Sequence, residues 1–371
     1  MPETPDLLTT ALHDRHIAMG AKMAPESGWE MPLKYRGVLD EVREVRSRAG
    51  VSDVSHLGRI RIRGGGAVDL LERLCTADPV HQEDHTALFT LLCNPRGGIL
   101  DAAFCLRLEN MWVLTTNACN REKVLDHLRA HAAGLDVKVD DQTPMTAMLS
   151  VSGPRAPELL DAVLPIRVAH TPRGWVHMGS LLIARYIAMR TGATGEWSLD
   201  VMLTKMMAGQ AWRFITDKAG DNAVAPVGTA ARDVLRIEAG LPRYGHEINE
   251  TIDPITAGLE RAVDFEHDFL GRDALLEIKR RGTARRLVGL AGAADSAEPP
   301  AIPRQGSRVL ADDGAEVGAV TSGTFSPALD RPVAMGYVSA AAAQPGTALR
   351  VETSAGPQPF HVAELPLHRR T

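Results

Sequence analysis

The stretch at residues 93–104, CNPRGGILDAAF, places one acid between two apolar runs and predicts a β-hairpin. Residues 87–93 (ALFTLLC) before it have the composition of a buried strand, and residues 99–108 (ILDAAFCLRL) that of the returning strand. The NPRGG between them is turn chemistry, because proline fixes φ and glycine tolerates positive φ. An unpaired buried carboxylate is costly, so Asp101 in this strand either faces water or is held for a purpose.

The amino-acid composition limits the classes of protein to which the chain can belong. The chain has 371 residues, of which 44% are hydrophobic and 23% charged, as in an ordinary globular protein of about two or three domains. A net charge of -5 favours no nucleic-acid partner. The four cysteines show no CxxC spacing, which predicts buried thiols in a reducing compartment.

The chain shows no targeting or membrane pattern. No apolar run approaches the ~20 residues that a membrane helix needs. The N-terminal sequence has early acids and neither a signal-peptide core nor an Arg-rich transit pattern. These features predict a cytoplasmic protein with no membrane partner.

Two α+β units and a separate β region are expected. A strand, a glycine turn and a helix follow one another at 56–75, and the same plan recurs at 147–164. Leucines at helical spacing predict an opening helix over 4–20, with Thr4 as its cap. From residue 285 onward, short strands joined by Asp-Gly and Ala-Gly turns predict a small all-β domain, plausibly a barrel.

Two motifs are best explained structurally. The RGGG at 63–66 could cradle a phosphate, but it lacks the rest of a P-loop or dinucleotide fingerprint, so a tight turn is the favoured interpretation. His127 and His131 have a spacing that can bind metal, but no third ligand stands nearby. A solvated helix face explains them better, and no metal is expected.

Four polar residues are the candidates for a functional site: Asp101, Asn117, Glu196 and Arg232. Taken singly, each has an ordinary explanation: a turn acid, a helix N-cap for Asn117, or a surface ion pair. Glu196 follows two glycines that let backbone approach a ligand closely, and Arg232 could bind an anion or pair with a carboxylate. Their order along the chain is what favours a functional interpretation.

That order, with the blocks around it, resembles the aminomethyltransferase family, the T-protein of the glycine cleavage system, over nearly the whole chain. The matching blocks are HDRHIAMGAKMAP, GWEMPLKYRG, DVSHLGRIRIRG, NPRGGILD, TTNACNREK, TGATGEWSLDV, ARDVLRIEAGLPRYGHEI, DFLGRDAL, VTSGTFSPAL and AMGYV. Many blocks in the right order are more specific than any one motif.

The resemblance implies a three-domain α+β fold around a central cavity that binds tetrahydrofolate. It predicts a discontinuous folate-binding domain, residues 1–52 plus 142–280, and an inserted α+β domain at 53–141. The third domain is a C-terminal antiparallel β-barrel at 285–371, which agrees with the change of sequence style near residue 285.

The family's reaction moves the methylene of an aminomethyl group from the lipoyl arm of the H-protein to tetrahydrofolate and releases ammonia. The resemblance gives Asp101 the catalytic role, as the carboxylate that accepts a hydrogen bond and stabilises a cationic intermediate. Glu196 matches the acid of the YTGE motif and would bind the pterin ring through two parallel donors. Asn117 and Arg232 match folate-contacting positions, with Arg232 able to orient Glu196, and Leu57 would form an apolar wall.

Several positions depart from the family pattern. Ala193 replaces the Tyr of YTGE, and Arg261 stands where an aromatic residue is usual near the folate. Ser52 replaces a Phe. Glu26 and Ser27 replace a Phe and a small residue, respectively. Losing aromatic surface weakens stacking by about 1 kcal/mol per ring. Arg261 would instead offer a cation to the carboxylates of the folate tail.

These departures keep alternatives open. The main prediction is a tetrahydrofolate-dependent aminomethyltransferase with lipoylated H-protein as partner. The first alternative is a folate-dependent demethylase of a small methylated amine, sulfonium or ether. A second is a non-catalytic folate-binding protein of iron–sulfur cluster maintenance, which is disfavoured because residues 242–254 (PRYGHEINETIDP) lack the cysteine of that family's motif.

Overall fold

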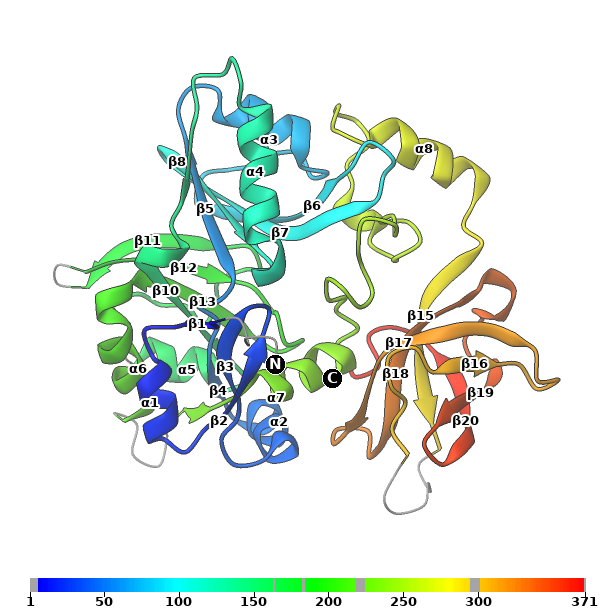
Figure 1. Ribbon diagram of the computed structural model, residues 1–371. Helices are drawn as coiled ribbons and strands as arrows, with labels where there is room; N and C mark the ends of the chain where they lie inside the picture. Colours follow the sequence, from blue (N-terminus) through cyan, green and yellow to red (C-terminus); the bar gives the residue numbers. More distant parts are fainter. Residues whose placement is uncertain (1–5, 163, 182–183, 218–223, 294–300, 370–371) are drawn as a thin grey trace. The chain divides into compact units, whose positions relative to one another are not determined.

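The computed structural model describes residues 6–162, 164–181, 184–217, 224–293 and 301–369 (Figure 1). The chain divides into two compact units. The first unit comprises Met1–Leu71, Pro79–Phe89 and Ala103–Arg232, and the second comprises Glu72–Asp78, Thr90–Ala102 and Asp233–Thr371. This division does not follow the predicted domain boundaries, which stay a prediction.

A six-stranded sheet forms one layer of the first unit, in the order β11-β12-β13-β10-β4-β14. Its strands are β4 (Gly50–Asp53), β10 (Thr146–Ser152), β11 (Val176–Leu181), β12 (Ala184–Arg190), β13 (Ser198–Thr204) and β14 (Ala225–Pro226). Helices α5 (Ala156–Asp161) and α6 (Ala208–Thr216) pack on one face of this sheet through Leu160 and Trp212, against strand residues such as Leu149. Helix α2 (Val38–Ser47) contacts β4 and β14 at its edge.

The predicted hairpin belongs to a five-stranded sheet of order β6-β7-β8-β5-β9. Its strands are β5 (Gly58–Arg63), β6 (Thr86–Cys93), β7 (Ile99–Leu108), β8 (Met111–Thr116) and β9 (Lys138–Asp141). Both predicted strands of the hairpin are confirmed, and the boundary between the two units crosses β6 and β7. Helix α4 (Arg121–His131) contacts β5 and β9, and α3 (Ala67–Leu74) follows β5.

The facing sides of these two sheets pack together within the first unit. We call the buried layer between them the intersheet core. It consists of Val54, Ala87, Leu106, Leu108, Val113, Met148, Val176, Met189 and Met202. The strand-turn-helix repeat predicted from the sequence is confirmed as β5–α3 and β10–α5, one in each sheet.

The hairpin turn shows why its glycines are needed. The Asn94 side chain accepts hydrogen bonds from the backbone N–H groups of Arg96 (2.9 Å) and Gly98 (3.1 Å), and Gly97 has a φ of 82°. A Cβ atom at Gly98 would lie 1.9 Å from the carbonyl oxygen of Glu250, so only glycine fits there. The turn is therefore fixed both by its own chemistry and by a neighbouring segment of the second unit.

The N-terminal segment differs from the prediction. It forms a three-stranded sheet, β1 (Leu8–Thr9), β3 (Trp29–Lys34) and β2 (Lys22–Glu26), and helix α1 is short, His13–Ala18. The predicted helix over 4–20 is thus wrong for residues 8–12, because β1 pairs with β3 in place of forming helical turns. Thr4 lies outside the described residues.

A buried polar network anchors this segment to β4. The Thr10 hydroxyl donates to Asp53 (2.6 Å), His16 lies 3.1 Å from the same carboxylate oxygen, and Tyr35 contacts the other ring nitrogen of His16 (2.8 Å). Burial alone would raise the pKa of Asp53, but the hydrogen bond and charge of His16 hold it below its ordinary value. Tertiary contacts, rather than helix propensity, therefore determine the conformation of this segment.

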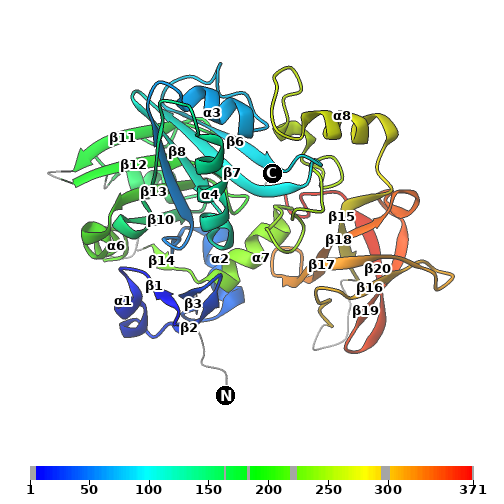
Figure 2. The ribbon, with the colours of Figure 1, turned by 45° about the horizontal axis from the view of Figure 1, so that its top comes forward.

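The second unit contains a closed barrel, as predicted (Figure 2). Its order is β15-β18-β17-β16-β19-β20, with every neighbouring pair antiparallel. The strands are β15 (Arg285–Gly292), β16 (Arg308–Leu310), β17 (Glu316–Ser326), β18 (Arg331–Ser339), β19 (Ala348–Thr353) and β20 (Gly356–Ala363). Helix α8 (Arg272–Arg281) precedes the barrel, and α7 (Thr229–Glu238) runs across the boundary between the two units.

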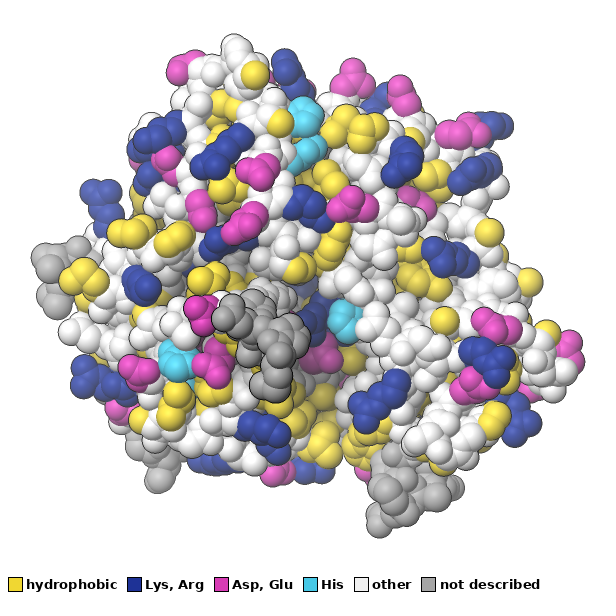
Figure 3. All heavy atoms as spheres, in the orientation of Figure 1, with side chains coloured by type: hydrophobic (Ala, Val, Ile, Leu, Met, Phe, Trp, Pro, Cys, Tyr) yellow, Lys and Arg dark blue, Asp and Glu magenta, His cyan; other side chains and the backbone are white. Residues whose placement is uncertain are grey.

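Short 3-10 turns complete the described structure: η1 (Ala118–Asn120), η2 (Thr143–Met145), η3 (Lys205–Met207), η5 (Glu260–Ala262) and η6 (Ala340–Ala342). Basic and acidic side chains are interspersed on the face seen in Figure 3, without a large patch of one sign. Among the described helices, none combines the length and apolarity required to cross a membrane.

His127 and His131 form a close pair on α4, with ring centroids 4.5 Å apart. Burial and the neighbouring His131 lower the pKa of His127 to about 4. The prediction of a solvated helix face is therefore only partly right, because His127 is half-buried. Within the described part of the chain, no group of three or more His, Cys, Asp or Glu side chains is placed to hold a metal ion.

This pair predicts an acid-dependent loss of stability. Because the pKa of folded His127 lies below the ordinary 6.5, the unfolded chain binds more protons as the pH falls from 6.5 towards 4. Between pH 7.5 and pH 5, the free energy of unfolding of the wild type should fall by about 1 kcal/mol more than that of His127→Gln, allowing for partial solvent exposure of the ring. Urea unfolding at both pH values measures it, with exposed His170→Gln as the control. An equal pH dependence in wild type and His127→Gln would contradict the assignment.

Candidate folate site

The predicted site residues fall into both units. Leu57, Asn117, Glu196 and Arg232 belong to the first unit, and Asp101 and Arg261 belong to the second. Each group is described within its own unit.

Glu196 braces the loop between β12 and β13. Its carboxylate accepts a hydrogen bond from Arg46 on α2 (2.8 Å), and the same Arg46 nitrogen donates to the carbonyl of Thr194 (3.3 Å). Gly192 and Gly195 have φ values of 98° and 79°, which let the loop turn back over this pair. Both charged side chains are largely buried, so Glu196 holds the loop shape against α2.

A row of polar side chains crosses three strands of the six-stranded sheet. Asp200 on β13 lies opposite Ser150 on β10, which lies opposite Ser52 on β4. Opposed residues in a sheet have Cβ atoms about 4.5–5.5 Å apart, so these three side chains stand side by side. Met148 and Met202, two residues further along their strands, belong to the intersheet core. The row therefore lies on the face that looks towards the other sheet.

Several polar atoms around this row lack partners. Asp200 Oδ1, Ser150 Oγ, Ser152 Oγ and Thr191 Oγ1 are buried and make no hydrogen bond of ordinary geometry with the described residues, although the Ser150 and Thr191 hydroxyls lie close enough to Asp200 to affect its pKa. Native structures leave few such groups, because each costs about 1–3 kcal/mol when desolvated and unpaired. Four of them in one patch leave hydrogen-bonding capacity that a polar ligand can use.

Arg232, at the start of α7, supplies the charge opposite Asp200. Burial raises the pKa of Asp200, and the charge of Arg232 and the nearby hydroxyls of Ser150 and Thr191 act against that rise. Burial likewise lowers the pKa of Arg232, which the charge of Asp200 opposes. Arg232 thus interacts with Asp200, and Arg46 pairs with Glu196. The orientation of Glu196 by Arg232 stays a prediction.

Leu57 is held in place by a buried arginine that sequence reasoning missed. The guanidinium of Arg59 donates to the carbonyl oxygens of Leu57 (2.6 Å), Ser55 (3.1 Å) and Thr143 (2.9 Å). Arg59 is fully buried, and burial lowers its pKa to about 10. The Leu57 side chain packs partly buried against the intersheet core, which suits an apolar wall.

Asn117 closes β8 and occupies the N-cap position of η1, with extended backbone. Its side chain makes no capping hydrogen bond there, and Asn120 occupies the corresponding position before α4, also without a side-chain cap. The helix-cap alternative considered for Asn117 is therefore not what the structure shows.

Asp101 is fully buried in the second unit. Burial alternates along the start of β7: Ile99 and Asp101 are enclosed, whereas Leu100 and Ala102 are half-buried. Successive side chains of a strand point to opposite faces, so the Asp101 carboxyl shares the enclosed face with Ile99. The structure thus favours the held acid over the water-facing acid, and its catalytic role stays a prediction.

Arg261 lies in η5, exposed, and forms no ion pair with the described residues. The neighbouring Glu260 pairs instead with Lys279 (2.8 Å). Among the other departures, Ser52 joins the polar row, and its hydroxyl donates to the carbonyl of Val227 (2.9 Å). A Phe at position 52 would place an apolar ring in that row.

Known proteins with similar sequences and structures share this architecture. Residues 12–267 match the model of the GCVT N-terminal domain, and residues 285–368 match that of the glycine cleavage T-protein C-terminal barrel domain. Aminomethyltransferases of Streptomyces avermitilis and Streptomyces coelicolor are 38% and 37% identical to the chain, over 97% and 98% of both sequences. The crystal structure of the glycine cleavage system aminomethyltransferase T from Bartonella henselae, 33% identical, aligns with a TM-score of 0.89 over 98% of each chain.

The fold, shared over 98% of each chain with that structure, defines a protein of the aminomethyltransferase class of transferases. Within that class, the chain belongs to the aminomethyltransferase family, the T-proteins of the glycine cleavage system.

The buried ion pair between Glu196 and Arg46 predicts an effect on stability. Glu196→Gln removes the charge that Arg46 faces and leaves a largely buried cation, so the free energy of unfolding should fall by about 1–3 kcal/mol. Chemical denaturation measures it. Glu158→Gln, which breaks an exposed pair with Arg155, is the control and should change stability by less than about 0.5 kcal/mol. Equal, small effects of both substitutions would show that Glu196 does not brace the loop.

Proposed function

We propose that this chain transfers the methylene of an aminomethyl group from the lipoyl arm of an H-protein to tetrahydrofolate, with release of ammonia. The observation that carries the proposal is the buried polar row of Ser52, Ser150 and Asp200, with Arg232 facing Asp200, on the intersheet face of a chain that matches a family member over 97% of its length.

The chemistry sets what the site must do. The transferred carbon exchanges its bonds to sulfur and to the ammonia nitrogen for bonds to two folate nitrogens. The two folate N–H protons end on the thiol and on ammonia, so no oxidant or reductant is needed. The protein therefore has to orient the pterin, exclude water and stabilise the cationic intermediate formed while the carbon changes partners.

The polar row suits the pterin edge. The ring amino group and the adjacent ring N–H are two parallel donors, and a buried carboxylate with an unpaired oxygen accepts both. Asp200 offers such a carboxylate; burial raises its pKa, and the charge of Arg232 opposes that rise. In this proposal Glu196 positions the loop that ends in β13, Leu57 forms an apolar wall, and Asn117 offers an amide.

Asp101 is proposed as the acid beside the reacting folate nitrogen, and Arg261 as the cation for the folate tail. Burial holds the Asp101 carboxylate in one place and in a low dielectric, where its charge acts strongly on a nearby cation. Exposure without an ion pair leaves Arg261 available to a carboxylate.

The direct test supplies aminomethyl-lipoyl H-protein and tetrahydrofolate and measures ammonia and methylene-tetrahydrofolate together. We expect the two products in equal amounts. Tight folate binding with no transfer from H-protein would overturn the proposal. A small methylated amine, sulfonium or ether would then be the donor class to assay.

The proposed pterin-binding role of Asp200 is tested by the tetrahydrofolate affinities of two variants. Asp200→Asn offers one acceptor where the ionised carboxylate offers two, so tetrahydrofolate affinity should fall about tenfold or more. Calorimetric titration measures it, with exposed Asp126→Asn as the matched control. Glu196→Gln in the same titration tests the predicted contact of Glu196 with folate. An unchanged dissociation constant in Asp200→Asn, with a tenfold loss in Glu196→Gln, would assign the pterin to Glu196.

The catalytic role of Asp101 predicts a loss of turnover without a loss of fold. Asp101→Asn is isosteric and should cut turnover by about 10²-fold, with folate affinity largely kept. Single-turnover kinetics and a thermal melt are measured on the same preparation. Near wild-type turnover would remove Asp101 from the mechanism, and a lowered melting temperature with normal turnover would make it a structural acid of the hairpin.

A further inference from the structure

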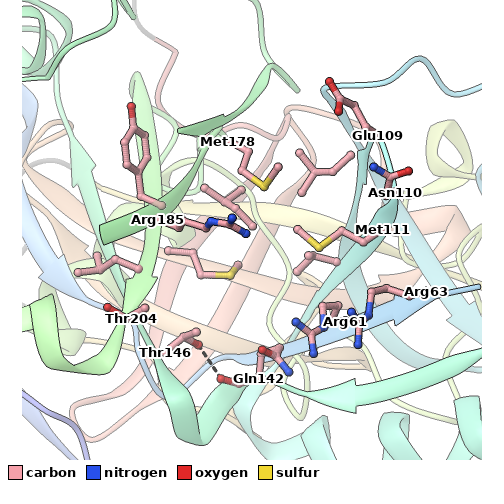
Figure 4. A pocket seen from close by; sticks show the side chains of 16 residues that line it. Arg61, Arg63, Glu109, Asn110, Met111, Gln142, Thr146, Met178, Arg185 and Thr204 are labelled. Atoms are coloured by element: carbon pink, nitrogen blue, oxygen red, sulfur yellow. Dashed lines mark hydrogen bonds between the residues drawn. The ribbon is translucent and has the colours of Figure 1, made fainter. Parts of the chain in front are cut away.

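A pocket opens at the edge of the intersheet core, within the first unit (Figure 4). Its volume is about 470 Å³, inside the range of roughly 300–1,000 Å³ usual for ligand sites. Strands of both sheets contribute to it: Arg185 reaches in from β12, and Arg61 and Arg63 line it from β5.

The interior of this pocket is apolar and adaptable. Met111 and Met178 face each other across it, and Met202, Leu108 and Ile187 continue the lining into the intersheet core. Methionine side chains are flexible and polarizable, so such a lining accommodates an aliphatic chain of variable shape. Met178 is still 37% exposed, which leaves its part of the lining open to solvent.

The charged groups of the pocket are mostly cationic and incompletely paired. Arg61 and Arg63 share one carboxylate, Asp140, at 3.0 and 3.3 Å. The Nε–H groups of both arginines are buried and make no hydrogen bond with the described residues. Arg185 has no ion pair with the described residues, and the pocket's own acid, Glu109, lies 3.7 Å from His85.

The pocket is distinct from the proposed folate row. Along β13, Asp200, Met202 and Thr204 point to the same face, and only the last two line the pocket. Met148 and Met202 lie opposite each other and are buried in the intersheet core, between the row of Asp200 and the row of Thr204. A ligand in the pocket would therefore meet the apolar core without touching Asp200.

We propose that this pocket binds an amphiphilic anion, an aliphatic chain that ends in a carboxylate. The chain would occupy the space between Met111 and Met178, and the carboxylate would accept hydrogen bonds from the guanidinium groups of Arg61, Arg63 and Arg185, which line the pocket. An arginine fork matches a carboxylate in geometry and charge, and the apolar lining selects against a fully polar anion. This site goes beyond the proposed transfer reaction and does not depend on it.

The test uses decanoate as the probe, below the concentration at which it aggregates, with decanol as the neutral analogue. Protein labelled with ¹³C on its methionine methyl groups is titrated and followed by NMR. We expect saturable shifts of Met111, Met178 and Met202, no shift of Met206, which is 93% exposed, and no saturable effect of decanol. Absence of saturable binding, shifts spread over all methionines, or equal binding of decanol would each overturn the proposal.

Substitutions of the lining arginines test where the carboxylate of the bound ligand lies. Arg185→Gln and Arg61→Gln should each weaken decanoate binding about tenfold, as expected for a charge-assisted hydrogen bond. Exposed Arg350→Gln is the matched control and should leave the affinity unchanged. Met178→Glu places a negative charge in the lining and should abolish binding while tetrahydrofolate affinity stays the same. Equal affinities in wild type, Arg185→Gln and Arg61→Gln would show that the arginines do not recognise the anion.

Discussion

The face-to-face contact between the two sheets of the first unit is the constraint on which both polar sites depend. Its methionines and aliphatic side chains exclude water from the middle of the layer. Asp200 is buried beside this layer, so its carboxylate is weakly screened and interacts strongly with the charge of Arg232. A sheet packed on one face only could not create two such separated environments.

Stability and ligand binding make opposite demands on this layer. A hydroxyl or carboxylate oxygen that is buried without a well-formed hydrogen bond, as around Asp200, costs stability until a partner pairs with it. The surrounding structure offsets that cost with networks of its own, such as Arg46 with Glu196 and Asp53 with His16. These networks fix loops and strands before a ligand arrives, which is the preorganisation that positioning chemistry requires.

The departures from the family pattern gain a physical meaning in this setting. Ser52 extends the polar row where the family carries a Phe, so a stacking surface is exchanged for hydrogen-bonding capacity. Arg261 exchanges another aromatic for an exposed cation. Both changes replace ring surface with charge and hydrogen-bonding groups, while the matches that define the family extend over residues 12–267 and 285–368.

The sequence by itself determined the hairpin at residues 86–108, the two strand-turn-helix units and the C-terminal barrel, because their turn chemistry and alternation are local. It also selected Arg232 and Glu196 as candidate site residues. Only the tertiary structure decided that Arg46 pairs with Glu196, that Asp200 faces Arg232, and that residues 8–12 are not helical. Asp200 carries the same local pattern as Asp101, an acid inside a strand, and the pattern cannot say which partner lies opposite. Register between strands distant in sequence sets those partners, since one residue of slip would turn each side chain to the other face.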